Sequence, residues 1–430
     1  MNILVVGGGG REHAIIKKLK EDKRAEEIFA LPGNGGIAAD AVCLGGSATD
    51  IPAVIAAAKE NSIDFVVVAP DDPLVLGMVD ALEAEGFSCF GPGKSAAMIE
   101  GSKAFSKDLM KKYGIPTAAY ETFTDMDRAL AYVDECPLPA VVKADGLALG
   151  KGVLICETRD AARDAVRSMM EGWLFGDSGA TVVIEEFLTG PEVSVLSFTD
   201  GETVAPMVSS MDHKRALDGD KGLNTGGMGT VAPNPYYTPD VAAECMEKIF
   251  LPTIRAMKAE GRTFKGCLYF GLMLTPDGPK VIEYNCRFGD PETQVVLPLL
   301  ESSLLEIMLA VSEGRLAETE VRFSGKSACC VILASEGYPQ KYGKGFPITL
   351  PETAADERIY IAGAVSKDGR LLTSGGRVLG AVATAEQLPA AVERAYALAD
   401  RIHFDNAFCR RDIGRRALLF LERKRSQKEL

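Results

Sequence analysis

The sequence predicts a multidomain protein of α/β and α+β class, and three observations support this. The chain has 430 residues, which at about 150 residues per domain corresponds to about three domains. In the first hundred or so residues, short apolar runs alternate with helical patterns, which is typical of a parallel α/β unit. Later strand-like runs are paired across turns that contain Asp-Gly, which indicates antiparallel hairpins.

The elements of the first unit follow from its apolar runs. A strand is expected at residues 2–6, where NILVV stops at four glycines, and a helix at 11–20, where apolar residues have helical spacing. A second strand is expected at 28–31. The third, at 64–69, is continuous and β-branched, so we expect it to be buried on both faces.

Turn residues delimit the elements that follow. A helix is expected up to Tyr113, because Gly114 suits a helix C-terminus and Pro116 cannot continue the helix. Further strands are expected at 140–143, 153–156, 181–186, 192–198, 203–210, 267–274, 280–285, 327–334 and 358–364, with helices at 159–171 and 385–402.

Composition excludes several classes of function. A net charge of -13 argues against a non-specific nucleic-acid or anionic-membrane binder, and no apolar run reaches the ~18 residues of a spanning helix. The ten cysteines contain no C-x-x-C pattern and the N-terminus lacks secretory features, so we expect reduced thiols in a cytoplasmic protein. Three histidines give little support to a His-rich zinc site or a Ser-His-Asp triad.

Four glycines, Gly7 to Gly10, follow the first strand and open a helix. Backbone N–H groups at a helix N-terminus bind anions, so a phosphate is the natural ligand. A dinucleotide fingerprint would need glycine where Glu12 stands and an acid after the second strand, which instead runs into PGN. An NAD-dependent dehydrogenase is therefore disfavoured, whereas a tight turn without a ligand stays an alternative.

A second glycine-rich loop runs from Lys143 to Gly152. A lysine that ends a buried strand, glycines that let the loop close over phosphate oxygens, and Lys151 as a second cation all favour phosphate binding. The Walker A pattern is absent. The alternative is a flexible hairpin with solvated lysines.

The segment VIEYNCRFGDPE places Glu283, Asn285 and Arg287 at alternate positions. On a strand these side chains share one face. Carboxylate and amide oxygens suit Mg²⁺, and a guanidinium can grip a carboxylate or a phosphate, so the pattern favours a metal–phosphate site. The alternative is an ordinary Glu–Arg pair on an exposed strand.

The charged cluster DHKR at 212–215 precedes a glycine loop, NTGGMG, at 224–229. This combination suits an anionic substrate. The alternative is an ordinary surface loop.

Taken together, these segments resemble the ATP-grasp superfamily and, within it, the phosphoribosylamine–glycine ligase family. The resemblance runs nearly end to end and is most specific in NTGGMG and NCRFGDPETQ. It is carried by residues 7–14, 32–36, 100–107, 143–152, 184–194, 212–215, 224–229, 283–294, 375–380 and 409–414. It implies an N-terminal α/β (pre-ATP-grasp) domain at 1–102, an ATP-grasp domain at 103–318 with a small lid subdomain at about 120–190, and a C-terminal α+β domain at 319–430.

The resemblance also implies roles for individual residues. ATP would be bound by Lys103, Lys143, Gly150, Lys151, Gly152, Glu185, Glu186, Phe187, Leu188 and Glu192. The other substrates would contact Gly9, Gly10, Asn34, Asp71, Pro73, Lys214, Asn224, Thr225, Gly226 and Gly227. Arg287, Asp212 and Asp290 would be catalytic, and Glu283 and Asn285 would bind the metal. Three positions depart from the family pattern: Asp71, Leu149 and Glu336 replace a glutamate, an alanine and a glycine.

The implied activity is an ATP-dependent ligation in de novo purine biosynthesis. Glycine and 5-phospho-β-D-ribosylamine would give glycinamide ribonucleotide, ADP and phosphate through glycyl phosphate, with Mg²⁺ or Mn²⁺, in a monomer or homodimer. The nearest alternative is another ATP-grasp carboxylate–amine ligase or a carboxylase. A second alternative is a nucleotide-binding regulatory protein that has lost catalysis, which the presence of Lys143, Glu283, Asn285 and Arg287 disfavours.

Overall fold

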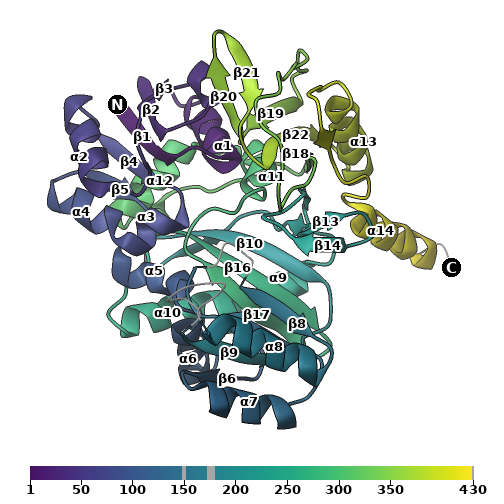
Figure 1. Ribbon diagram of the computed structural model, residues 1–430. Coiled ribbons are helices and arrows are strands. Elements are labelled where there is room, and N and C mark those ends of the chain that lie inside the picture. Colours follow the sequence, from purple (N-terminus) through teal and green to yellow (C-terminus); the bar gives the residue numbers. More distant parts are fainter. Residues whose placement is uncertain (148–151, 172–179, 429–430) are drawn as a thin grey trace.

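The computed structural model describes residues 1–147, 152–171 and 180–428, and Figure 1 shows the arrangement of its elements. The N-terminal sheet has the strand order β3-β2-β1-β4-β5, and every pair is parallel, as predicted. Its strands are β1 (Asn2–Gly7), β2 (Glu27–Pro32), β3 (Val42–Cys43), β4 (Phe65–Val68) and β5 (Ser88–Phe90).

Helices cover both faces of this sheet. Ile3 and Val5 of β1 belong to one hydrophobic cluster with α1 (Gly10–Leu19), whereas Leu4 and Val6 belong to another with α2 (Ile51–Glu60). Side chains of a strand alternate between its faces, so the apolar run of β1 must be covered on both sides. Three more helices complete the unit: α3 (Asp71–Leu76), α4 (Met78–Ala84) and α5 (Lys94–Gly101).

Two antiparallel sheets form the middle of the chain. The small sheet, at the bottom of Figure 1, has the order β6-β9-β7-β8 and packs against α7 (Met126–Glu135) and α8 (Arg159–Met170). Its strands are β6 (Tyr120–Phe123), β7 (Ala140–Ala144), β8 (Val153–Cys156) and β9 (Val182–Glu186). The preceding helix, α6 (Lys103–Tyr113), ends at Gly114, whose φ of +68° is the left-handed conformation that glycine favours.

The large sheet has the order β11-β10-β16-β17. Its strands are β10 (Glu192–Thr199), β11 (Val204–Pro206), β16 (Gly266–Thr275) and β17 (Gly278–Asn285). The associated helices are α9 (Pro239–Cys245), a π-helical turn (Met246–Phe250) and α10 (Leu251–Ala259); α11 (Thr293–Val296) and α12 (Leu304–Glu313) follow β17. The strand predicted at 203–210 is continuous only over Val204–Pro206, and its far end pairs with β10 again through a single bridge between Ser210 and Ser194.

The C-terminal sheet has the order β12-β15-β18-β22-β19, and β23 (Ala407–Phe408) also pairs with β18. Its strands are β12 (Met211–Asp212), β15 (Gly229–Ala232), β18 (Ser327–Ser335), β19 (Glu357–Ile361) and β22 (Arg377–Ala385). The segment 211–232 is therefore joined to this sheet through β15, which pairs with β18 about a hundred residues later. α13 (Leu388–Ala399) packs on this sheet, and α14 (Arg415–Lys428) ends the described chain.

Two hairpins project from this region: β13 (Arg215–Leu217) with β14 (Lys221–Asn224), and β20 (Ala364–Lys367) with β21 (Arg370–Thr373). The strand predicted at 358–364 ends earlier, at Ile361, because Ala364 pairs with Thr373 of the second hairpin. Among the described residues, no helix is both long and apolar enough to cross a membrane.

Candidate active site

Two of the predicted ATP-binding lysines lie at the junction of α6, the small sheet and β17. Lys103 is the first residue of α6, after the N-cap Ser102, and its Nζ donates to the Gly146 carbonyl oxygen at 2.6 Å. Lys143 is buried in β7; its Nζ donates to the Ile282 carbonyl oxygen at 3.2 Å and lies 2.9 Å from Glu185 Oε1. Both cations therefore lie close to the strand that carries Glu283.

Glu185 of β9 lies between two buried lysines. Its Oε2 is 3.0 Å from Nζ of Lys107, which also donates to Thr117 Oγ1 at 2.7 Å. Burial lowers the pKa of Lys107 to about 8, although Glu185 opposes the shift. The sequence interpretation missed Lys107, and its position one helical turn after Lys103 is the signal that could have found it.

The other predicted nucleotide residues lie at the end of β9 and the start of β10. Glu186 Oε1 accepts a hydrogen bond from the Ala119 N–H at 3.0 Å, Phe187 is 37% exposed, and Leu188 follows it before Glu192 opens β10. The carbonyl oxygen of Gly152 accepts a hydrogen bond from the Ala144 N–H at 2.9 Å. Gly150 and Lys151, with Leu149, lie outside the described residues, and the adenine and ribose roles stay predictions.

Glu283 and Asn285 are at alternate positions at the end of β17. Lys214 Nζ lies 3.4 Å from Glu283 Oε1. Lys214 first, and then Lys143 and Lys103, lower the pKa of Glu283 to about 2 against the opposing effect of burial. Glu283 is therefore ionised at neutral pH and lies beside the amide oxygen of Asn285.

The prediction placed Arg287 on the same strand face as Glu283 and Asn285. β17 ends at Asn285, however, so Arg287 approaches Asn285 from the turn that follows the strand. Its Nη2 donates to Asn285 Oδ1 at 3.3 Å and lies 3.4 Å from Glu100 Oε1 and 4.0 Å from Asp71 Oδ2. Its buried Nε–H has no hydrogen-bond partner in the described chain. A largely buried guanidinium whose Nε–H is not bonded within the described chain is suited to an oxygen of a substrate.

The donor set fits a metal that also takes oxygens from a substrate. In the described part of the chain, no group of three or more His, Cys, Asp or Glu side chains could hold a metal alone. Mg²⁺ commonly uses one or two protein carboxylates together with phosphate oxygens, and Glu283 with Asn285 supplies such a partial set.

Two acidic side chains, the buried Glu292 and the half-buried Asp212, interact in the same region. Burial first, and then the charge of Glu292, raise the pKa of Asp212 well above its usual value. Glu292 Oε1 accepts a hydrogen bond from Tyr269 Oη at 3.1 Å, and Tyr269 Oη is 2.7 Å from Ser194 Oγ. Glu292, which the sequence interpretation did not select, is thus hydrogen-bonded to Tyr269 and acts on Asp212 through its charge.

Asp290 faces the first glycine loop. Its Oδ1 accepts a hydrogen bond from Gln294 Nε2 at 2.7 Å, and a Cβ atom on Gly9 would lie 3.5 Å from its Oδ2. A Cβ on Gly10 would meet Gln294 Nε2 at 2.7 Å. The N-terminal domain therefore presents its glycine loop directly to the residues that follow β17.

Two predicted substrate residues are already engaged in hydrogen bonds. The Gly9 N–H donates to Glu12 Oε2 at 2.6 Å, so this donor is not free for a phosphate. The Asn34 amide donates to the carbonyls of Gly8 and Ile361, both at 2.9 Å, and accepts from two backbone N–H groups at 2.8 and 2.9 Å. The Asn34 side chain therefore joins the loop to β19, and its backbone carbonyl also accepts a hydrogen bond, from the Ala38 N–H at 3.1 Å.

The remaining predicted substrate residues lie nearby. Asp71 is the first residue of α3, and Pro73 is buried in the same helix. Thr225, next to Asn224, donates through Oγ1 to the Lys214 carbonyl at 2.8 Å. Gly227 has φ +114°, and a Cβ there would lie 2.7 Å from Asp212 Oδ1, so this position requires glycine.

His213 ties this loop to the C-terminal segment and predicts a pH dependence of stability. Its neutral ring accepts a hydrogen bond from the Gly414 N–H at 3.1 Å, and burial followed by the charge of Arg410 lowers its pKa to about 4. The unfolded chain therefore binds more protons between about pH 6.5 and 4. We expect His213 to contribute roughly 3 kcal/mol to the free energy of unfolding. This contribution should be fully present above pH 6.5 and should be lost as the pH falls towards 4.

Urea unfolding at pH 7.5 and pH 5 measures this dependence. The decrease in the free energy of unfolding between pH 7.5 and pH 5 should be smaller in His213→Gln than in the wild type. Replacing the exposed His403 by Gln should leave this decrease unchanged. Equal losses in all three proteins would refute the assignment to His213.

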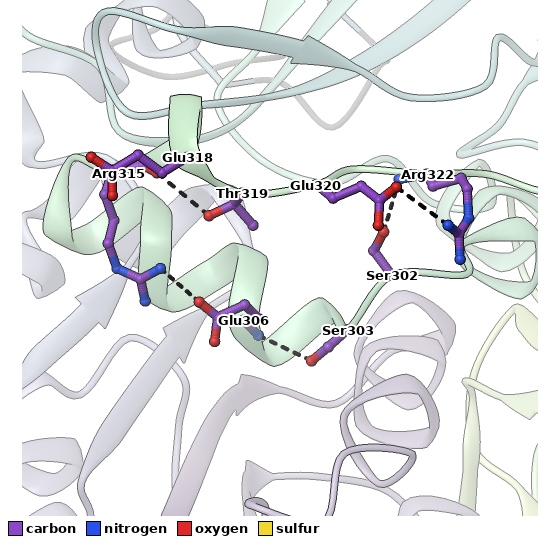
Figure 2. A pocket seen from close by; sticks show the side chains of 8 residues that line it. All are labelled: Ser302, Ser303, Glu306, Arg315, Glu318, Thr319, Glu320 and Arg322. Carbon is purple, nitrogen blue, oxygen red and sulfur yellow. Dashed lines mark hydrogen bonds and ion pairs between the residues drawn. The ribbon is translucent and has the colours of Figure 1, made fainter.

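A separate pocket of about 290 Å³ is shown in Figure 2. It is lined by Ser302, Ser303, Glu306, Arg315, Glu318, Thr319, Glu320 and Arg322. Arg315 Nη1 is 2.6 Å from Glu306 and Arg322 Nε is 2.8 Å from Glu301, so both cations are paired. None of the predicted site residues within the described ranges lines this pocket, and we assign no activity to it.

Comparison with known proteins identifies the family. The N domain, ATP-grasp (A) domain and C domain of phosphoribosylglycinamide synthetase match residues 1–100, 101–293 and 328–416. A phosphoribosylamine–glycine ligase of Pasteurella multocida is 47% identical over 422 residues, covering 97% of this chain and 98% of the relative. The corresponding protein of Caldanaerobacter subterraneus is 48% identical over 414 residues, 96% and 99% of the two chains.

Comparison with solved structures supports the same family and fold. The crystal structure of phosphoribosylamine–glycine ligase from Thermotoga maritima has a TM-score of 0.85 at 34% identity and covers 96% of this chain and 100% of that one. Biotin carboxylase from Campylobacter jejuni shares the fold at 17% identity, with a TM-score of 0.74 and coverage of 95% and 92%. These findings confirm the predicted ATP-grasp fold and the resemblance. The chain belongs to the phosphoribosylglycinamide synthetase family.

Proposed function

We propose that this protein joins glycine to 5-phospho-β-D-ribosylamine, with ATP as the energy source, in purine biosynthesis. The observation that carries this is the position of Glu283, which lies near three lysines and two residues before Asn285, the acceptor of an Arg287 hydrogen bond. Next to this group, Asp290 faces the glycine loop of the N-terminal domain. The family relationship supports these substrates, and the cations near Glu283 and the acid before the glycine loop support a triphosphate site beside an amine site.

The chemistry explains why such a site needs no protein nucleophile. A carboxylate is a poor electrophile, because its charge and resonance oppose attack by an amine. Transfer of the γ-phosphoryl group of ATP to glycine gives ADP and glycyl phosphate, an anhydride. The ribosylamine nitrogen then attacks the carbonyl carbon and displaces phosphate. The protein must hold three ligands in line and offset their negative charge.

Lys103 and Lys143 would contact the phosphates, since both ammonium groups lie near Glu283. Mg²⁺ or Mn²⁺ would be held by Glu283, Asn285 and phosphate oxygens, and when bound it would offset charge on the transferred group. The free Nε–H of Arg287 would donate to an oxygen of the phosphoryl group or of glycine.

The ribosylamine must lose a proton as the new C–N bond forms. Burial would raise the pKa of Asp290, but Arg377 and other cations outweigh it, so the pKa lies below its ordinary value and the group is ionised. An ionised carboxylate that faces the glycine loop can accept a hydrogen bond from the amine. Lid closure by residues 145–152, the monomeric or homodimeric state and the cytoplasmic location stay predictions.

The direct test is ADP formation by the purified protein with ATP, glycine and freshly made phosphoribosylamine. Full activity should need all three, and omission of any one should abolish it. ADP release that depends on bicarbonate in place of glycine would contradict the proposal and favour a carboxylase.

Glu283→Gln tests the metal ligand. Gln keeps one oxygen donor but removes the charge, so we expect the Mg²⁺ concentration for half-maximal activity to rise about tenfold or more. Glu301→Gln, on an exposed pair with Arg322, is the matched control and should leave the titration unchanged. Superimposable Mg²⁺ titrations of Glu283→Gln and wild type would remove Glu283 from the ligand set.

A further inference from the structure

The guanidinium of Arg377, at the start of β22, is where three distant motifs meet. Its Nη1 donates to the carbonyl oxygens of Gly226 at 2.7 Å and Asp290 at 2.8 Å, and to that of Gly227 at 3.4 Å. Its Nη2 lies 3.1 Å from Asp290 Oδ2. One side chain of the C-terminal domain therefore contacts both the glycine loop at 224–229 and the residue that faces the N-terminal glycine loop.

The surrounding glycines leave room for this arrangement. A Cβ on Gly226 would lie 2.9 Å from Cζ of Arg377, which is closer than real side chains approach. The Gly226 N–H donates to Tyr338 Oη at 3.1 Å, and a Cβ on Gly376 would overlap the Tyr338 ring. Two glycines from different motifs are thus explained by the space that Arg377 and Tyr338 occupy.

Arginine is required here for its shape as well as its charge. The planar guanidinium has separate N–H groups that reach a carboxylate and several carbonyls at once, whereas a lysine ammonium is a single point of charge. A lysine at position 377 could pair with the Asp290 carboxylate or satisfy the loop carbonyls, but not hold both in their present relation.

We propose that Arg377 is a positioning residue for the amine-transfer half of the reaction. It acts through Asp290, whose carboxylate it holds towards Gly9, and through the 224–229 loop. The inference rests on the proposed function. The contacts of Arg377 are with loop carbonyls and Asp290, whereas Lys103, Lys143 and Glu185 are held by other residues, so nucleotide binding should not depend on Arg377.

The test compares Arg377→Lys with Arg394→Lys, a matched change at an exposed arginine paired with Asp356 in the same domain. For Arg377→Lys we expect kcat/KM for phosphoribosylamine to fall about 100-fold while KM for ATP stays within about threefold of wild type. Arg394→Lys should match wild type in both. An equal decrease in kcat/KM for ATP and for phosphoribosylamine, or no decrease in either, would overturn the proposal.

A double-mutant cycle with Asp290→Asn shows whether Arg377 acts through that carboxylate. Arg377→Lys should cost far less in the Asp290→Asn background than in wild type, and additive losses would contradict a role through Asp290. If Arg377→Lys does not fold, Gly226→Ala, which displaces the guanidinium and keeps its charge, should give the same selective loss. Wild type is assayed first: absence of glycine-dependent ADP formation would refute the proposed function itself, whereas an active wild type with an unselective Arg377→Lys would refute only this inference.

Discussion

Replacing Arg287 by methionine should lower kcat about 100- to 1,000-fold while KM for ATP changes about threefold or less. The guanidinium lies beside Asn285 and Glu100, and its buried Nε–H is free to donate. The hydrogen bond from such a donor becomes strongest when negative charge moves on to the oxygens of the transferred group. Removing the donor therefore destabilises the transition state more than the bound nucleotide. Steady-state kinetics with ATP, glycine and phosphoribosylamine each varied in turn measure this split.

Arg322→Met is the control for Arg287→Met, since Arg322 pairs with Glu301 at the surface away from the site. It should keep wild-type constants. An Arg287→Met enzyme whose turnover at saturating ATP equals that of wild type, with only KM for ATP raised, would contradict the assignment and make Arg287 a nucleotide-binding residue.

The second large effect is expected for Lys143→Met, which should lower kcat/KM for ATP about 100-fold or more. Lys143 lies 2.9 Å from Glu185 and donates to the carbonyl of Ile282, which precedes Glu283. Its ammonium therefore connects the strand predicted to hold adenine with the predicted metal ligands. Initial-rate kinetics as a function of ATP, with thermal unfolding followed in parallel, measure the loss of activity per folded molecule.

Lys107→Met is a stringent control for Lys143→Met. Lys107 is equally buried and pairs with the other oxygen of Glu185, but its second contact is Thr117 rather than the strand of Glu283. Both variants leave Glu185 with one lysine, so both should be similarly destabilised, whereas we expect Lys107→Met to lose about tenfold or less in kcat/KM. Equal kinetic losses would mean that Lys143 serves only to neutralise Glu185.

Local patterns predicted those parts of the fold whose signals lie within one element. The apolar runs gave correct positions for β1, β2 and β4 because a buried parallel strand must be apolar on both faces. The pairing of β12 with β15, and of β15 with β18, could not be predicted in this way. Both strands are short, and the second partner of β15, β18, lies about a hundred residues later in the chain.

The site was predictable where its residues form compact motifs. The structure brings together the three residues of one such motif, Glu283, Asn285 and Arg287, although Arg287 lies in the turn after the strand rather than on it. Glu100 belongs to the 100–107 segment but was missed as a site residue, because its partner, the Cys286 N–H at 2.6 Å, lies 186 residues away. Arg377 was missed as a site residue for the same reason, since its contacts at Gly226 and Asp290 exist only in the folded chain.

The central claim is that the carboxylate of glycine is phosphorylated before the amine attacks, and oxygen transfer tests it most directly. Glycine labelled with ¹⁸O in both carboxylate oxygens is incubated with the enzyme, ATP and phosphoribosylamine, and the phosphate product is analysed by mass spectrometry. Because phosphate leaves with the bridging oxygen of the anhydride, each phosphate should carry one ¹⁸O atom. Phosphate without label, formed together with glycinamide ribonucleotide, would contradict the mechanism.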